Sequence, residues 1–460
     1  TEGTAARPTL MATPQTRFPG LDALRGGALV VVVGYHLGYL RGGFLGVDLF
    51  FVLSGFLLTG LALVEIERTD TIGLRAFWGR RIRRLGPALL VMVPVAIVGA
   101  LLLDWPTTER RDLAVDGMAT LTWWANWRQV LVPDGGYWSE VPNLFRHAWS
   151  LSVEEQFYVV WPLLLTACIA LAARGRRNPR LVVGVVAGSL ALLSGTWALV
   201  LAHRLPGADL ARVYLGSDTR ALAPLVGWVM GAVWWGRPAG RVVRALGWAA
   251  VVGLLVLVVI VDVDEPTTYR TPVLALVAVL AGLAVLGATG WSRIDPVSTW
   301  IGHRSSGLYP WSWPLPVLVE HWRPSAGRAQ VAAVTIPLTV LAAELSWRFV
   351  EHPVQRHRWW ATRAAVRRAA ASVGLVVALV ATTVAVSTAT EKAPHERMTD
   401  VEMAEAALAP PPAPDPGEGS AVPGGGAAST DERVMLVGDS VAFSYARYAA
   451  EIGPVDGVAS

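Results

Sequence analysis

Charged residues are scarce in this chain, and cysteine is almost absent. Only 16% of its 460 residues are charged and 53% are hydrophobic, whereas a soluble globular protein carries about 25% charged residues. This deficit excludes an ordinary soluble domain and predicts a polytopic membrane protein. The single cysteine, Cys168, excludes an internal disulfide and a cysteine metal site, and we expect no bound metal. The arginines form no basic domain apart from the apolar segments, which argues against nucleic-acid binding.

Long apolar runs recur along the chain, and each is a candidate membrane helix. We expect an all-α polytopic membrane fold, with about ten transmembrane helices in a bundle and an eleventh linking helix. The 21 tryptophans suit the membrane interfaces and aromatic-lined cavities. The candidate helices cover residues 22–40, 47–66, 85–103, 149–173, 181–202, 219–236, 245–262, 272–290, 304–322, 329–350 and 370–389.

Arginine clusters occur in alternate loops between these runs. The positive-inside rule makes these loops cytoplasmic, with the N-terminus inside and the C-terminus outside the membrane. Residues 1–17 lack the apolar core of a cleaved signal peptide, so we expect the first span to be retained. The clusters are Arg75, Arg80, Arg81, Arg83 and Arg84; Arg174, Arg176, Arg177 and Arg180; Arg237, Arg241 and Arg244; and Arg356, Arg358, Arg363, Arg367 and Arg368.

Arg25 and His36 lie eleven residues apart in the first apolar segment. At about 100° and 1.5 Å per residue, they share one stripe of a helix, about 16 Å apart along its axis. Polar groups at membrane depth are costly and by default mark a functional site. An imidazole also titrates near neutral pH, as a general base requires. The alternative is that His36 is a buried histidine whose hydrogen bonds are satisfied.

Asp48 and Ser54 lie in the second apolar segment, within GVDLFFVLSGF. Asp48 could hold His36 by a hydrogen bond, which would fix the tautomer of the imidazole and raise its basicity. It could equally cap the N-terminus of its own helix. Ser54 could be a small residue that allows close helix packing.

Arg81 and Arg84 lie three residues apart and share a helix face. A pair of guanidinium groups at the cytoplasmic surface suits the phosphates of a nucleotide-bearing donor. Contact with anionic lipid and anchoring of the topology are the alternatives.

Two carboxylates, Glu154 and Glu155, fall in the first turns of an apolar helix within WSLSVEEQFYVVWP. An unpaired carboxylate is costly there, although a helix N-terminus favours it electrostatically. Tyr158, one turn further on, suits stacking on a sugar ring or a place in the interface belt.

Three prolines, Pro310, Pro314 and Pro316, interrupt the segment SSGLYPWSWPLP. A broken helix is tolerated at membrane depth only where it lines a cavity or packs on protein. A substrate cavity could therefore lie here.

The C-terminal part differs in composition from the rest of the chain. Residues 391–430 are rich in proline and glycine, as in an extended, flexible tether. The sequence RVMLVGDS then runs from a short apolar strand into a small-residue turn, as at the start of an extracytoplasmic α/β domain.

Over residues 18–356 the chain resembles the acyltransferase-3 family of integral membrane acyltransferases. The matching strings, in order, are FPGLDALRGGALVVVVGYH, GVDLFFVLSGFLLTG, FWGRRIRRLGPALL, WSLSVEEQFYVVWPLLL and ELSWRFVEHPVQR. The tether followed by LVGDS resembles the variant with a fused SGNH-type domain. The expected parts are a cytoplasmic tail (1–17), the acyltransferase domain (18–356), a basic loop with the eleventh helix (357–390), the linker (391–430) and an SGNH-like fragment (431–460).

The resemblance implies roles for individual residues. The usual histidine of the proline-rich block is Ser312 here, which puts a direct catalytic role for that position in doubt. Ser440, in Gly438-Asp439-Ser440, would be the SGNH nucleophile. Only 20 residues follow it, and we expect the domain to be incomplete because its activating aspartate and histidine are missing. The implied catalytic residues are His36, Asp48 and Glu154; the donor-binding residues are Arg25, Arg81 and Arg84; further motif residues are Ser54, Tyr158, Tyr309 and Trp311.

The resemblance also implies a reaction. An acyl group, often acetyl, would pass from cytoplasmic acyl-CoA to a hydroxyl of an envelope or exported carbohydrate or glycoconjugate in a bacterial plasma membrane. Acyl-CoA would be a substrate rather than a permanently bound cofactor, and membrane lipid would be a further partner. His36, oriented by Asp48, would deprotonate the acceptor or first accept the acyl group itself.

Two other classes of protein remain open at this point. The first is a transporter or flippase of a lipid-linked glycan or acyl donor, which would also use broken helices and intramembrane charge. Internal repeats would favour it, and none is visible. The second is an extracellular esterase on a membrane anchor, for which ten further spans are more than an anchor requires.

Overall fold

A computed structural model describes residues 18–106, 109–132, 143–206, 210–237, 239–292 and 294–356. Within these ranges the chain is predominantly helical and forms no β-strand. The longer helices are α1 (Pro19–His36), α2 (Gly46–Thr69), α3 (Leu74–Leu102), α4 (Arg110–Leu121), α6 (Ala148–Arg174), α7 (Pro179–Arg204), α10 (Leu222–Trp234), α11 (Arg241–Ile260), α13 (Val273–Ala288), α14 (Pro296–Trp311), α15 (Pro314–Trp322) and α16 (Arg328–Ser346). The short ones are η1 (Arg41–Leu45), α5 (Ala125–Leu131), α8 (Ala211–Leu215), α9 (Ser217–Arg220), α12 (Pro266–Arg270), the π-helical turn η4 (Trp347–Glu351) and α17 (His352–Arg356).

Every apolar run expected as a membrane helix before residue 356 is a helix or a helix pair. Six stretches in the described part are long and apolar enough to cross a membrane: Arg41–Thr69, Leu74–Leu102, Ala148–Arg174, Pro179–Arg204, Arg241–Ile260 and Arg328–Arg356. α13 is apolar but shorter. The expected helix at 370–389 and the segments after it, including Ser440, lie outside the described residues.

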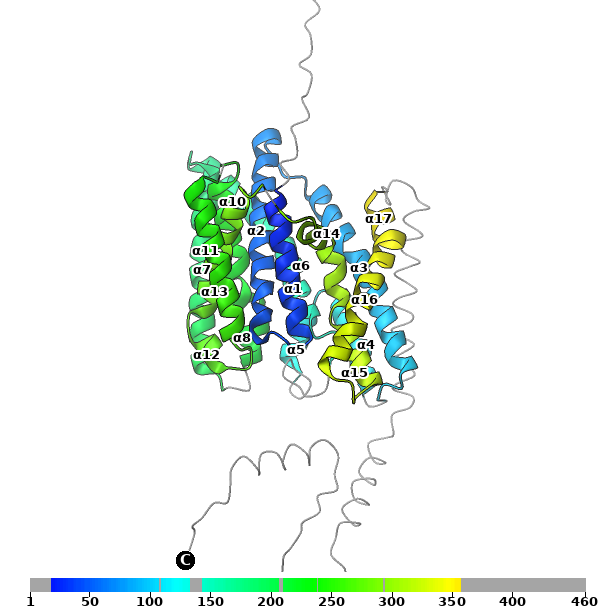
Figure 1. The fold of residues 1–460 in the computed structure, drawn as a ribbon. Helices are drawn as coiled ribbons and strands as arrows, with labels where there is room; N and C mark the ends of the chain where they lie inside the picture. The colour runs from blue at the N-terminus through cyan, green and yellow to red at the C-terminus, as the bar shows by residue number, and fades with distance from the viewer. Residues whose placement is uncertain are drawn as a thin grey trace, which may run out of the picture. The chain divides into compact units, whose positions relative to one another are not determined.

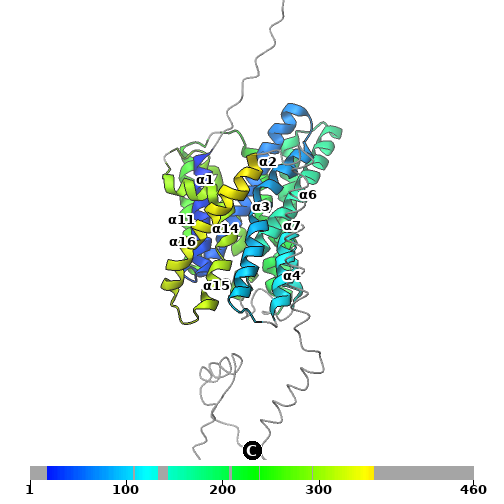
Figure 2. The same ribbon diagram turned by 90° about the vertical axis from the view of Figure 1, so that its right-hand side faces the viewer.

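The helices form a bundle with α1 and α2 at its centre. Figure 1 shows α7, α10, α11 and α13 on one side of this centre and α3, α14 and α16 on the other. Figure 2 shows the second side, where α16 packs against α14 and α15, and both of these contact α3. The central helices therefore carry the residues that neighbours on both sides can reach.

Those expected arginine-rich turns that fall within the described residues lie at one end of the bundle (Figure 1). Arg180, at the start of α7, donates to Glu67, near the end of α2, at 2.7 Å. The starts of α1 and α3 lie at this end as well, whereas α8, α12 and α15 lie at the opposite end (Figure 1).

Glycines set how closely α1 and α14 approach each other. A Cβ atom at Gly26 would lie 2.2 Å from the Ser298 carbonyl oxygen, and one at Gly302 would lie 1.8 Å from that of Asp22. Neither distance is possible for a real side chain, so the two backbones meet only because both residues are glycine. This contact holds α1 against α14, and His36 at the end of α1 lies beside Ser312 of the proline-rich block.

The proline-rich block is broken, as expected. α14 ends at Trp311 and α15 begins at Pro314. Pro314 begins α15, where a missing N–H costs little. The break leaves Ser312 and Trp313 free of regular helix, and both lie beside His36.

Candidate functional site

Five helices converge on a cavity that we call the arginine cavity. It brings together most of the residues singled out from the sequence, which come from segments far apart in the chain. Its polar lining residues are Arg25 of α1, Ser54 of α2, Arg81 and Arg84 of α3, Ser150, Glu154, Glu155 and Tyr158 of α6, and Ser305, Ser306 and Tyr309 of α14.

The charges of the arginine cavity are unequal. Three guanidinium groups, from Arg25, Arg81 and Arg84, face two carboxyl groups, from Glu154 and Glu155. An excess of guanidinium groups suits an anionic ligand, and their planar forks match phosphate oxygens.

Glu154 is held by two hydroxyl groups. Ser54 and Tyr158 both donate to its Oε1 atom, and the two hydroxyl oxygens lie 3.2 Å apart. Because each donor already uses its proton on the carboxylate, the Glu154 side chain is fixed in the cavity wall. The sequence placed these three residues on two different segments without predicting this contact.

Arg81 is held by stacking. Its guanidinium carbon lies 5.2 Å from the ring centre of Tyr158 and 5.8 Å from that of Phe77. Trp78 donates to the Tyr158 carbonyl at 2.9 Å and ties α3 to α6 at this point. Cation–π contact of this kind orients the guanidinium without consuming its N–H donors.

His36 lies in a second, smaller cavity, which we call the histidine chamber. Aromatic rings form most of its wall, and His36, His147 and Arg146 supply its basic groups. The other lining residues are Val32, Tyr35, Phe44, Val47, Trp149, Tyr214, Tyr309 and Trp313.

Ser312 is the hydrogen-bond partner of His36. The His36 Nδ1 atom lies 3.0 Å from the Ser312 hydroxyl oxygen, and that hydroxyl donates to the Tyr309 carbonyl at 2.8 Å. Since the serine proton is used on the carbonyl, we assign the imidazole proton to Nδ1. The lone pair then sits on Nε2, as a general base requires.

The expected bond between Asp48 and His36 is not formed. Asp48 instead accepts a hydrogen bond from Arg220 at 2.8 Å, and the two side chains are only 4% and 2% exposed. A buried guanidinium is a stronger partner for a carboxylate than a neutral imidazole is. Asp48 therefore acts on the histidine chamber only indirectly.

The link runs through Arg220. Its guanidinium carbon lies 5.4 Å from the ring centre of Trp149 and 5.3 Å from that of Tyr214. Both rings line the histidine chamber, and they lie 4.6 Å apart. The ion pair thus supports the aromatic wall from behind.

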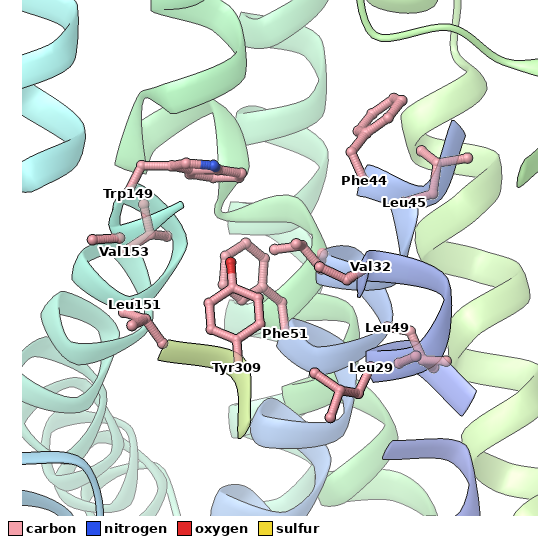
Figure 3. Close-up of a cluster of buried hydrophobic side chains, with 14 of the residues drawn as sticks. Leu29, Val32, Phe44, Leu45, Leu49, Phe51, Trp149, Leu151, Val153 and Tyr309 are labelled. Atoms are coloured by element: carbon pink, nitrogen blue, oxygen red, sulfur yellow. The ribbon is translucent and has the colours of Figure 1, made fainter. Parts of the chain in front are cut away.

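Tyr309 separates the two cavities. It lines both of them, as Val47 does. Its hydroxyl lies 2.6 Å from that of Ser150 and donates to the His147 carbonyl at 3.1 Å. Figure 3 shows its ring between Trp149 and Leu151 on one side and Val32 and Leu29 on the other.

Several residues of the site were missed from the sequence, namely His147, Arg220 and Ser150. His147 lies just before the string WSLSVEEQFY and Ser150 lies within it, so their nearness to Glu154 in the sequence was the available signal. Arg220 had no such signal, because only its contact with Asp48 gives it a role.

Trp311, the last of the motif residues predicted within the described chain, is buried, with 3% of it exposed. It lines neither of the two cavities described above. Across the described ranges, no group of three or more histidine, cysteine or acidic side chains is placed to hold a metal ion.

Comparison with known proteins adds a family and several relatives. A family model described as an acyltransferase domain matches residues 18–348. Peptidoglycan O-acetyltransferase OatA of Listeria monocytogenes is 34% identical over 364 residues, which cover 74% of this chain and 56% of the relative. The putative peptidoglycan O-acetyltransferase YrhL of Bacillus subtilis is 32% identical, and the aligned residues cover 74% of this chain and 55% of the relative. A putative O-acetyltransferase of Staphylococcus aureus is 31% identical, and the aligned residues cover 74% of this chain and 57% of the relative.

The chain therefore spans little more than half the length of the curated relatives it matches. No solved structure gives a significant match to it.

Proposed function

Because this chain belongs to the acyltransferase-3 family of integral membrane acyltransferases, we propose that it transfers an acyl group from cytoplasmic acyl-CoA to a carbohydrate hydroxyl outside the membrane. The relatives' names specify acetyl as the acyl group and, in two cases, peptidoglycan as the acceptor. We therefore propose an acetyl donor and an envelope glycan acceptor. The same names do not favour a transporter of lipid-linked glycan.

One observation carries this proposal: an arginine-lined cavity and a histidine chamber share a wall made by Tyr309 and Val47. A donor with phosphates suits the first cavity, and a general base suits the second. An acyl group that passes from donor to acceptor must cross this wall.

The orientation of the chain fits that route. The arginine-rich turns lie at the end of the bundle where α1 begins. The positive-inside rule favours the cytoplasm for that end. Arg25 is then toward the cytoplasm, and His36 is toward the outside. The proposed location is a bacterial plasma membrane, with acyl-CoA entering from the cytoplasm.

In the direct route, His36 Nε2 takes the proton of the acceptor hydroxyl as its oxygen attacks the thioester carbon. The C–S bond then breaks, the ester forms, and the departing CoA thiolate takes the proton from His36. Arg25, Arg81 and Arg84 hold the donor phosphates, and Glu154 fixes the wall beside them. In the two-step route, the Nε2 atom of His36 first attacks the thioester carbon, and the C–S bond breaks to release the CoA thiolate. The acceptor oxygen then attacks the acyl carbon, the C–N bond breaks, and the acceptor proton passes to the thiolate.

The test is transfer by purified protein in proteoliposomes given radiolabelled acetyl-CoA and solubilised peptidoglycan fragments. We expect His36→Ala to reduce transfer by at least about 10²-fold, as loss of a general base does. His203→Ala changes an exposed histidine of α7 and is the matched control. Full activity of a folded His36→Ala protein would overturn the assignment, and label that stays on the protein without acceptor would indicate the two-step route.

A further inference from the structure

The histidine chamber contains a second imidazole that the proposed reaction does not yet use. His147 is the residue immediately before α6, and only 3% of it is exposed. Its ring centre lies 6.1 Å from that of His36 and 5.6 Å from that of Tyr309. The two histidines therefore line one small cavity, His36 from the end of α1 and His147 from the turn before α6.

His147 differs from His36 in its hydrogen bonds. Neither of its ring nitrogens has a partner among the described residues. The Pro310 backbone lies near the ring, but the contact lacks the geometry of a hydrogen bond. The backbone carbonyl of His147, by contrast, is engaged by Tyr309 and Ser150.

An unpaired polar group at this depth has a cost. A buried donor or acceptor without a partner loses about 1–3 kcal/mol, and native structures contain few of them. A leucine or phenylalanine would fill the same space without that cost. The histidine is therefore better explained by a ligand atom that it meets in the chamber.

We propose that His147 is a second catalytic residue, whose ring N–H donates a hydrogen bond to the carbonyl oxygen of the acyl group. This assignment rests on the proposed function. As the acceptor oxygen adds to the thioester carbon, the carbonyl becomes an oxyanion, and a fixed N–H donor stabilises it. The negative charge returns to the carbonyl when the C–S bond breaks, and the proton balance through His36 is unchanged.

The hydrogen-bond partners of the two imidazole rings assign a different role to each histidine. His36 donates from Nδ1 to Ser312 and offers a lone pair on Nε2. His147 has no carboxylate or hydroxyl partner in the described residues to raise its basicity, and its neutral ring still presents one N–H. A general base and a hydrogen-bond donor in one cavity are two groups that acyl transfer uses.

The experiment compares His147→Leu, His147→Asn and His147→Gln with the wild type. The assay uses proteoliposomes, acetyl-CoA and solubilised peptidoglycan fragments, with thiol release as the readout. We expect His147→Leu to lower kcat by roughly 10²-fold with little change in the KM for acetyl-CoA, because the bond forms only in the transition state. His203→Leu, which replaces an exposed histidine of α7, is the matched control.

The two amide variants make the donor role falsifiable even if His147→Leu does not fold. The side-chain amide of asparagine or glutamine can place an N–H near Nδ1 or Nε2. We expect one of the two to retain at least about tenfold more kcat than His147→Leu. An equal loss of kcat in all three folded variants, or a wild-type kcat in His147→Leu, overturns the role of His147 and leaves the proposed function standing. No thiol release by the wild type would overturn the proposed function as well.

Discussion

At the scale of single residues, Ser312 takes the place beside His36 that a carboxylate occupies in many general-base sites. It accepts from Nδ1 and donates onward to the Tyr309 carbonyl. A serine fixes the tautomer and the ring orientation, but it adds no negative charge. The proposed base, His36, is thus oriented without being made more basic by a neighbouring carboxylate.

Ser312→Ala should therefore weaken catalysis without abolishing it. We expect kcat to fall by about 10-fold to 100-fold, because the imidazole keeps its lone pair but loses its fixed tautomer. Ser312→Thr keeps a hydroxyl and should retain most of the activity. Steady-state acetyl transfer in proteoliposomes measures both effects.

Ser325→Ala is the control, since Ser325 is exposed in the turn between α15 and α16. An unchanged kcat in Ser312→Ala would show that the bond to His36 does not contribute.

At the scale of helices, the Asp48–Arg220 pair joins α2 to α9 inside the bundle. Breaking a buried ion pair by removing one partner costs about 3–5 kcal/mol, because the other charge stays buried. Asp48→Asn and Arg220→Gln should each lower both the thermal stability in detergent and the kcat. The second effect arises because the partner that remains is an unpaired buried charge, which disturbs the packing of Trp149 and Tyr214.

The double variant separates this indirect role from the direct one expected from the sequence. Asp48→Asn combined with Arg220→Gln leaves no buried charge and should recover much of the lost stability and activity. If Asp48 instead oriented His36 directly, the double variant would stay as inactive as Asp48→Asn. Melting temperature and kcat of the four proteins decide between them.

Two adjacent glycines of α1 provide a sharp test of helix packing. A Cβ atom at Gly26 would lie 2.2 Å from the Ser298 carbonyl oxygen, whereas one at Gly27 would meet nothing within 4 Å. Gly26→Ala should cost about 3 kcal/mol or more, at the upper end of overpacking effects. Gly27→Ala should be neutral or stabilising by about 0.4–1 kcal/mol. Equal melting temperatures in detergent would contradict this packing.

The helices were easier to predict than their contacts. A membrane helix needs about 20 apolar residues, and this requirement is visible in the sequence. α4 and α5 were missed because they are short and polar, and α3 begins at Leu74, before its apolar run, because arginines favour helix. Spacing also predicted that Arg25 and His36 share one helix, and α1 contains both.

The partners across helices could not be predicted in the same way. His36 and Ser312 are 276 residues apart, and Asp48 and Arg220 are 172 apart. Asp48 could pair with His36, which is near in the sequence, or with a distant arginine. Only the packing of α2 against α10, the helix that follows Arg220, selects Arg220. The competition between a neutral imidazole and a guanidinium is decided by charge, which spacing does not reveal.

At the scale of the whole molecule, the proposed reaction depends on which face of the membrane each cavity faces. An arginine cavity open to the cytoplasm can meet acyl-CoA, and one open to the outside cannot. The single native cysteine, Cys168, is buried, so its replacement by alanine gives a background for labelling at chosen sites.

In that background, we expect Arg176→Cys and Ser325→Cys to label from opposite sides. Arg176 is exposed in the turn between α6 and α7, at the arginine-rich end, and Ser325 is exposed between α15 and α16, at the other end. A membrane-impermeant maleimide should react with Ser325→Cys in intact bacterial cells. It should reach Arg176→Cys only after permeabilisation, because the positive-inside rule places that turn in the cytoplasm. The reverse pattern would place the arginine cavity on the outer side of the membrane, where it cannot meet acyl-CoA. It would overturn the proposed donor even if the His36 variants lose activity.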